Sequence, residues 1–189
     1  MAVRPILRLG NPVLRTPARA VDPAELGRGA TQDLIDDLIE TMRAASGVGI
    51  AAPQVGADLQ IFLYERHVDE EGSDPGYPDI PLRVVVNPMV APTSHGMIYD
   101  WEGCLSIPDL RGLVPRYPSV RLRGLDRAGR PIDFAATGFE ARIIQHEFDH
   151  LNGIVFLDRM RDLRSLAFTD EWHEFLVRAG STEEAATLG

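Results

Sequence analysis

The chain has 189 residues, of which 44% are hydrophobic and 25% are charged. This length fits one domain that buries a substantial core without disulfides or a structural metal, and the composition is that of a globular protein. The net charge of -9 argues against direct DNA binding and against binding to anionic membranes, because both need a basic surface.

No apolar run approaches the roughly 18 residues of a membrane-spanning helix. Arginines and prolines interrupt the N-terminal segment MAVRPILRLGNPVLR, where a secretory signal would be continuously apolar. The one cysteine, Cys104, cannot form an internal disulfide and suits a reducing compartment. We therefore expect a cytoplasmic protein with no membrane partner.

The N-terminal half predicts a helix, a turn and a strand. The helix is predicted to begin at Thr31 as its cap and to end at Gly47 in a left-handed conformation. Its apolar stripe consists of Leu34, Ile35, Leu38, Ile39 and Met42. GVGIAAPQVG follows as a glycine-rich turn leading to the short strand QIFLYE. Residues 66–81 are acidic and rich in glycine and proline, which predicts a surface loop.

Strand signals dominate the middle of the chain. LRVVVNP and MIYDWEGCLS are strand candidates, and SVRLRGL and RPIDFAA flank DRAG as a hairpin. The clearest helix begins at Thr137, which forms a capping box with Glu140, and ends at Gly153.

The last predicted helix begins near Thr169, and residues 181–189 are predicted to be a flexible tail. The apolar face of this helix would dock on the core through Trp172, Phe175, Leu176 and Ala179. Together the elements predict an α+β fold in a single domain, 1–189. Mixed or antiparallel strands would pack around a central helix, with one helix N-terminal and one C-terminal to it.

The central helix carries two histidines four residues apart, in QHEFDH. Residues i and i+4 lie on one helix face roughly 6 Å apart, so His146 and His150 can bind one metal ion. Glu147 lies about 100° around the helix from His146 and would flank the ion as a proton acceptor. Asp149 and His95 fall outside this pattern, and we assign them surface or structural roles.

A third ligand is needed, because a catalytic metal commonly has three protein ligands and one open position. The downstream candidates are carboxylates: Asp158, Asp162, Glu171 and Glu174. The upstream candidate is Cys104, where the preceding glycine lets the backbone lie close to an ion. Two imidazoles and a thiolate suit Fe(II), Zn, Ni or Co alike. The spacing alone leaves both alternatives open.

Three segments, GVGIAAPQ, EGCLS and QHEFDH, resemble the three motifs of the peptide deformylases, and the resemblance runs from about Ile6 to Met160. It implies a hydrolase that removes the N-formyl group from formyl-methionine at the start of new polypeptides and releases formate. Its metal ligands would be Cys104, His146 and His150, with Fe(II) expected and Zn, Ni or Co possible.

The resemblance also implies roles around this metal. Metal-bound water would attack the formyl carbon, with Glu147 as general base and acid. The Gln54 amide and the backbone N–H of Leu105 would stabilise the oxyanion. The Gly49 backbone would pair with the substrate peptide. The other substrate-binding candidates are Val48, Phe139 and Ile143 for a methionine pocket, with Ile50 and Arg111 beside them. The implied partners are N-formylmethionyl nascent peptides and, transiently, the ribosome.

We also hypothesise that Glu102 pairs with Arg116 and so supports the strand that carries Cys104. Two other functions compete with deformylation. One is a general metallopeptidase with a downstream carboxylate ligand, and the other is a metal-binding or interaction module without catalysis. The presence of Cys104, Gln54 and Glu147 together favours the deformylase.

Overall fold

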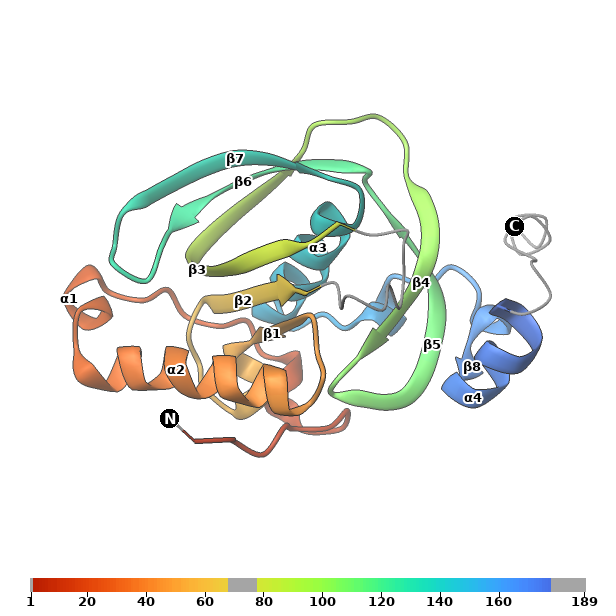
Figure 1. Cartoon of the computed structure of the whole chain (residues 1–189), viewed down its shortest axis with the longest axis horizontal. Helices are drawn as coiled ribbons and strands as arrows, with labels where there is room; N and C mark the ends of the chain where they lie inside the picture. The colour runs from red at the N-terminus through yellow and green to blue at the C-terminus, as the bar shows by residue number, and fades with distance from the viewer. Residues whose placement is uncertain (1, 68–77, 178–189) are drawn as a thin grey trace.

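The computed structural model describes residues 2–67 and 78–177. Within them the strands form two antiparallel sheets, shown in Figure 1. The larger sheet has five strands in the order β1-β2-β3-β6-β7, and the smaller has three in the order β4-β5-β8. The predicted α+β class is confirmed.

The strands, in chain order, are β1 (Gly49–Ala51), β2 (Ile61–Arg66), β3 (Ile80–Pro92), β4 (Ile98–Cys104), β5 (Ile107–Arg116), β6 (Ser119–Leu125), β7 (Pro131–Thr137) and β8 (Ala167–Phe168). The α-helices are α1 (Pro23–Leu26), α2 (Gly29–Ala44), α3 (Gly138–Leu151) and α4 (Thr169–Glu171), and α4 continues as a π-helix, Trp172–Val177. Four short 3-10 turns connect these elements: Pro12–Arg15, Ala52–Val55, Phe156–Asp158 and Leu163–Ser165.

The five-stranded sheet lies between two helices. Successive side chains of a strand point to opposite faces, and β2 follows this rule. Ile61 and Leu63 pack with α2 in one apolar cluster, whereas Phe62 and Tyr64 pack with α3 in another. Each fully buried aliphatic or aromatic side chain stabilises the fold by about 1.5–3 kcal/mol. In Figure 1, α3 lies at the centre, between the larger sheet and the strands β4 and β5.

The helix α2 begins two residues before the predicted start. It starts at Gly29, and Thr31 is a buried residue of its first turn, not a cap. Arg28 occupies the N-cap position without a side-chain hydrogen bond. The burial of Thr31 on the inner face of α2 therefore takes precedence over the preference of threonine for a cap position.

The end of α2 also differs from the prediction. The Gly47 N–H donates to the Met42 carbonyl at 2.9 Å, and the Ser46 N–H donates to the Arg43 carbonyl at 3.0 Å. These two bonds form a Schellman motif. The left-handed residue is Ser46, with φ 52, so the prediction that Gly47 has this conformation is wrong.

The helix α3 follows Thr137 as predicted, but the capping box is absent, because the Thr137 side chain makes no capping hydrogen bond. Glu140 instead accepts a hydrogen bond from the Tyr64 hydroxyl at 3.0 Å and pairs with Arg83. The predicted stop at Gly153 is confirmed, with φ 71 after the last helical turn.

The predicted hairpin is confirmed. In it β6 pairs with β7 from Ser119 opposite Thr137 to Leu125 opposite Pro131, and the turn between them contains Gly129 with φ 79. The strand β5 was not predicted, and the structure pairs it with β4 along most of its length. The ends of the predicted 66–81 loop belong to β2 and β3, and residues 68–77 lie outside the described chain.

The C-terminal helix was predicted to dock through its apolar face. Trp172 does pack on Trp101, with ring centroids 5.9 Å apart. Phe175 is 58% exposed, so its predicted docking is wrong. The Leu176 side chain, Ala179 and the predicted 181–189 tail lie outside the described residues. No helix among the described residues is long and apolar enough to cross a membrane.

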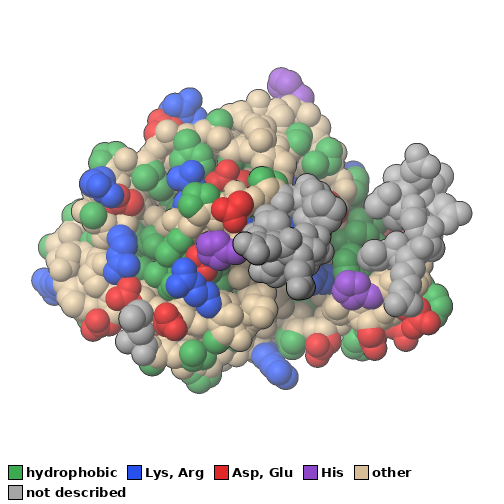
Figure 2. Space-filling model, viewed as in Figure 1, with side chains coloured by type: hydrophobic (Ala, Val, Ile, Leu, Met, Phe, Trp, Pro, Cys, Tyr) green, Lys and Arg blue, Asp and Glu red, His purple; other side chains and the backbone are tan. Residues whose placement is uncertain are grey.

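The surface charges are mixed. On the face shown in Figure 2, arginines and acidic side chains alternate over much of the left half. Elsewhere in the described residues, exposed ion pairs also join opposite charges, as in Arg121 with Asp133 and Arg19 with Glu25. The left half of this face therefore carries no broad basic area of the kind that nucleic-acid binding needs.

Gly153→Ala should destabilise the protein. A Cβ there would lie 2.6 Å from the Arg15 carbonyl oxygen, and the left-handed φ disfavours any side chain. We expect a loss of about 2 kcal/mol, which lowers the Tm by roughly 4–8 °C. Gly27→Ala is the control, because Gly27 has a negative φ and open space around it. Equal Tm values for Gly153→Ala and the parent protein would contradict this reading of the helix end.

Candidate metal centre

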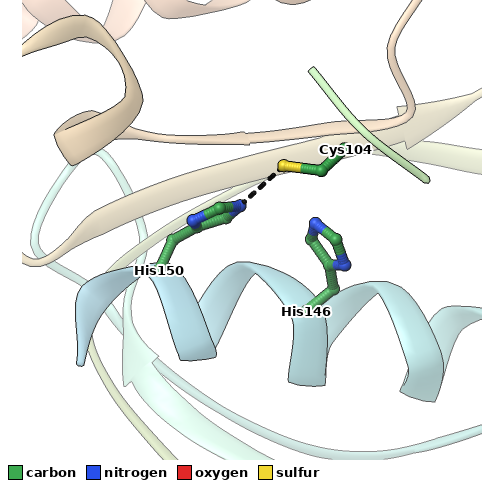
Figure 3. Close-up of side chains that lie close together, drawn as sticks. All are labelled: Cys104, His146 and His150. Atoms are coloured by element: carbon green, nitrogen blue, oxygen red, sulfur yellow. Dashed lines mark hydrogen bonds between the residues drawn. The ribbon is translucent and has the colours of Figure 1, made fainter. Parts of the chain in front are cut away.

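Three side chains converge between α3 and the end of β4. One ligand atom each from Cys104, His146 and His150 lies within 4.8 Å of the other two. The Cys104 Sγ lies 3.2 Å from the His150 Nε2, and the two imidazole centroids are 5.1 Å apart. Figure 3 shows both imidazoles rising from α3 toward the sulfur. The structure thus brings all three predicted ligands together.

Local geometry explains how separated segments meet here. His146 and His150 share one face of α3 through their i, i+4 spacing. Cys104 is the last residue of β4, and the pairing of β4 with β5 shifts register between Glu102 and Cys104. Such a bulge turns a side chain away from the regular pleat, which directs the thiol toward the helix.

The downstream carboxylates are engaged elsewhere. Asp158 accepts hydrogen bonds from Arg15 and from the Val155 N–H, and Asp162 pairs with Arg164. Glu171 and Glu174 are exposed beyond β8. The geometry therefore favours Cys104 over these candidates as the third ligand.

The residues present fit a divalent metal ion. Two imidazoles and a thiolate form a donor set that suits Zn or Fe(II) and leaves one position open. Within the described chain, Oε2 of Glu147 and Nδ1 of His150 are buried polar atoms without a hydrogen-bond partner. A buried carboxylate oxygen without a partner is rare, and it indicates that Glu147 faces a place where a polar molecule binds.

Glu102 fixes the orientation of His146. Its Oε2 lies 2.8 Å from the His146 Nδ1, which leaves Nε2 as the ligand atom. The same carboxylate accepts from Arg116 at 2.9 and 3.0 Å and from Arg142 at 2.8 Å, so the predicted pair of Glu102 and Arg116 is present. Burial alone would raise the pKa of Glu102, but His146 and Arg116 outweigh it and hold this pKa well below its usual range.

Asp149, the aspartate of QHEFDH, extends the same network. It is 4% exposed and accepts hydrogen bonds from Arg116 and Arg159. Of the two roles predicted for it, surface or structural, the structural one is correct. Arg116 thus joins the strand that carries Glu102 to the helix that carries the histidines.

Glu147 is buried against the backbone of β1. A Cβ added at Gly49 would lie 2.4 Å from the Glu147 Oε1, so this carboxylate can occupy its place only beside a glycine. Burial raises the pKa of Glu147 to about 7. A cation held by the neighbouring ligands would lower this pKa, because positive charge favours the carboxylate.

Gln54 is 1% exposed, and three contacts fix its amide group. Its Oε1 accepts from the Ala51 N–H at 2.8 Å. Its Nε2 donates to the Ser106 Oγ at 3.2 Å and lies 3.7 Å from the Cys104 Sγ. The amide N–H groups therefore point toward the sulfur side of the site.

Ser106 is a site residue that the sequence reasoning missed. It is fully buried, and its position as the last residue of EGCLS was the available signal. Backbone hydrogen bonds from the N-terminal segment reach both Gln54 and Ser106. The Leu7 N–H donates to the Gln54 carbonyl at 2.8 Å, and the Leu9 N–H donates to the Ser106 carbonyl at 2.9 Å. The loop of Gln54 and the turn after Cys104 are thus tied together.

A cavity of about 400 Å³ opens beside the ligands. The predicted site residues that line it are Val48, Gly49, Gln54, Cys104, Leu105, Arg111, Phe139, Ile143, His146 and Glu147. Ile50 differs from them, because its side chain is fully buried in the cluster under α2 and does not line the cavity. The Ile50 side chain is therefore not placed to contact a substrate, and the role of this residue in substrate binding stays a prediction.

Comparison with known proteins identifies relatives along most of the chain. The sequence pattern of the polypeptide deformylase family matches residues 3–165. Peptide deformylase 1 of Nitrosomonas europaea is 46% identical over 171 residues, covering 89% of this chain and 93% of the relative. Peptide deformylase 2 of Pseudomonas putida is 43% identical over 173 residues, with the same shares of each chain covered.

Solved structures share the fold. A class I type b peptide deformylase from Acinetobacter baumannii, with Met-Ala-Ser bound, has a TM-score of 0.79 at 37% identity and covers 84% of this chain and 99% of its own. A peptide deformylase from Synechococcus elongatus, in complex with actinonin, has a TM-score of 0.74 at 34% identity and covers 94% of this chain and 86% of its own.

Arg116→Ala should destabilise the fold and weaken metal binding. Removing one partner of a buried ion pair costs about 3–5 kcal/mol, and here Glu102 and Asp149 each lose one of their cationic partners. We expect a lower Tm together with a lower metal content after dialysis. Arg121→Ala is the control, because its pair with Asp133 is exposed. Unchanged metal content and Tm in Arg116→Ala would rule out the support that we assign to this residue.

Proposed function

The chain belongs to the polypeptide deformylase family, and we propose that it removes the formyl group from N-formylmethionyl nascent polypeptides by metal-dependent hydrolysis. One observation carries this proposal. Cys104, His146 and His150 converge beside a cavity that is lined by Cys104, His146 and the buried Glu147. A protein that only binds a metal does not require the buried Glu147 carboxylate oxygen without a hydrogen-bond partner beside the ligands.

The proposed ligands are Cys104 Sγ, His146 Nε2 and His150 Nε2, and Fe(II) is the proposed ion, with Zn, Ni or Co as alternatives. An ion held there would lower the pKa of a bound water and polarise the formyl oxygen. The carboxylates Asp158 and Asp162 already have arginine partners, which disfavours the metallopeptidase alternative.

Glu147 is the proposed general base and acid. Its Oε2 accepts a proton from the attacking water while the bond from water oxygen to formyl carbon forms. It then returns this proton to the methionine nitrogen as the bond from carbon to nitrogen breaks. Formate and a free α-amino group are released. The burial that raises the pKa of Glu147 to about 7 supports both halves of this transfer.

Gln54 and Leu105 are the proposed donors to the formyl oxygen. This oxygen gains negative charge in the tetrahedral intermediate, so a donor already in place stabilises the intermediate more than the substrate. Gln54 meets this requirement because Ala51 and Ser106 fix its amide. The second donor is the backbone N–H of Leu105, which follows directly after Cys104 and lines the same cavity.

The rest of the cavity is suited to a peptide. Val48, Phe139 and Ile143 are proposed to contact the methionine side chain, and the Gly49 backbone to pair with the peptide backbone. Arg111 is proposed to bind peptide oxygens further along the chain. Transient contact with the ribosome and a cytoplasmic location complete the proposal, since nascent chains are the substrate.

Formate release from a formyl-Met-Ala-Ser peptide tests the function. Protein purified without oxygen should release formate, and Glu147→Gln should lower kcat by a factor on the order of 10² to 10⁴ while the metal is retained. Cys104→Ala should lose the metal itself. Glu140→Gln is the control, because Glu140 lies on the same helix and binds Tyr64 away from the ligands.

Two outcomes would contradict the proposal. Metal-loaded parent protein that releases no formate would exclude the activity but would not contradict the metal site. Full activity in Glu147→Gln would exclude the assigned base.

Ser106→Ala tests how Gln54 is held. Loss of one hydrogen bond, about 1.4 kcal/mol, should lower kcat about tenfold with little change in KM or metal content. The same substitution should have almost no further effect in a Gln54→Ala background, because the two residues act as one unit. Ser119→Ala, which removes a hydroxyl on β6, is the control. Additive losses in the double variant would show that Ser106 acts independently of Gln54.

A further inference from the structure

The segment 167–172, which we call the C-terminal arm, reaches the cavity at Thr169. It follows directly after residues 3–165, where the family pattern matches. Its strand β8 pairs with β5, with Ala167 opposite Arg111 and Phe168 opposite Leu110. The arm is thus the third strand of the sheet that carries Cys104, and Thr169 lines the cavity.

The arm also holds the side chain of Arg111. The guanidinium carbon lies 5.4 Å from the ring centroid of Trp172, and this ring packs on Trp101. On its other side the guanidinium lies against Gly103, where an added Cβ would be 3.0 Å from the Arg111 Cζ. Arg111 is therefore held between the backbone next to Cys104 and the aromatic face of the arm, the arrangement of a cation–π contact.

Among residues 2–67 and 78–177 no carboxylate pairs with the Arg111 guanidinium and no oxygen accepts from it. The side chain is half-buried and lines the cavity. None of its nitrogens is among the fully buried polar atoms without a partner in the described residues, so its donors stay open to solvent. The five N–H groups of this guanidinium are therefore available to an acceptor of a molecule bound in the cavity.

We propose that the C-terminal arm is a wall of the substrate site, in which Trp172 holds Arg111 so that its guanidinium binds backbone oxygens of the residues that follow formyl-methionine. The proposal rests on the proposed function and adds to the Arg111 contact proposed there the aromatic face that positions it. Trp172 is a positioning residue that acts through Arg111. Extended peptides of three or more residues should bind more tightly through this contact with Arg111. A single formyl-methionine amide is too short to reach it.

Substrate length is the variable that tests the proposal. Trp172→Ala should raise KM about threefold to tenfold for formyl-Met-Ala-Ser peptides, the range that a partly desolvated cation–π contact supports. It should leave kcat unchanged, and KM for formyl-Met amide should change less than twofold. Trp172→Phe should recover most of the loss, because it keeps an aromatic face. Phe175→Ala is the control, since this exposed side chain follows in the same segment.

A binding measurement separates this proposal from the catalytic one. The product tripeptide Met-Ala-Ser should bind metal-loaded Trp172→Ala more weakly than the parent protein by the same factor, whether or not formate release is observed. In an Arg111→Ala background, Trp172→Ala should add no further loss. Equal losses for short and long ligands, or additive losses in the double variant, would overturn the proposal and leave Trp172 a structural residue. Unchanged KM and binding in Trp172→Ala would overturn it as well.

Discussion

The buried contact of Arg116 with Glu102 and Asp149 is the interaction on which the site depends. Arg116 lies on β5, Glu102 on β4 and Asp149 on α3, so one guanidinium joins the small sheet to the central helix. All three side chains are 5% exposed or less. Burying such charges is costly, and it is tolerated only when every charge has a partner. The network therefore allows one relative position of β4 and α3.

That position decides where the ligands lie. Cys104 follows two residues after Glu102, and His146 contacts the Glu102 carboxylate directly. The carboxylate that orients the imidazole thus belongs to the strand that supplies the thiol. On the opposite side, β1 places Gly49 against Glu147, and the N-terminal segment ties Gln54 to Ser106. The larger sheet supports the base and the amide, and the smaller sheet supports the thiol.

Local patterns predicted the parts of this arrangement that depend on neighbouring residues. The i, i+4 histidines, the stop at Gly153 and the β6–β7 hairpin are properties of short segments, and the structure has them. The cap at Thr31 failed because this side chain is buried on α2, and the capping box at Thr137 failed because Glu140, its other member, contacts Tyr64 and Arg83. Spacing alone left the third ligand open, because the pattern of one segment carries no information about a strand some 40 residues away. Cys104 followed only from the resemblance to the deformylase motifs, and the fold brings its thiol to the two histidines.

The central claim is that Cys104, His146 and His150 hold one ion together. Replacement of the native metal by Co(II), followed by electronic absorption spectroscopy, tests it most directly. A site made of these three ligands should bind one Co(II) per chain, with a thiolate-to-cobalt charge-transfer band and the d–d bands of a four-coordinate ion. Cys104→Ser should lose the charge-transfer band while any remaining cobalt is held by the histidines. A cobalt-loaded protein without that band, or a Cys104→Ser variant that keeps it, would contradict the account.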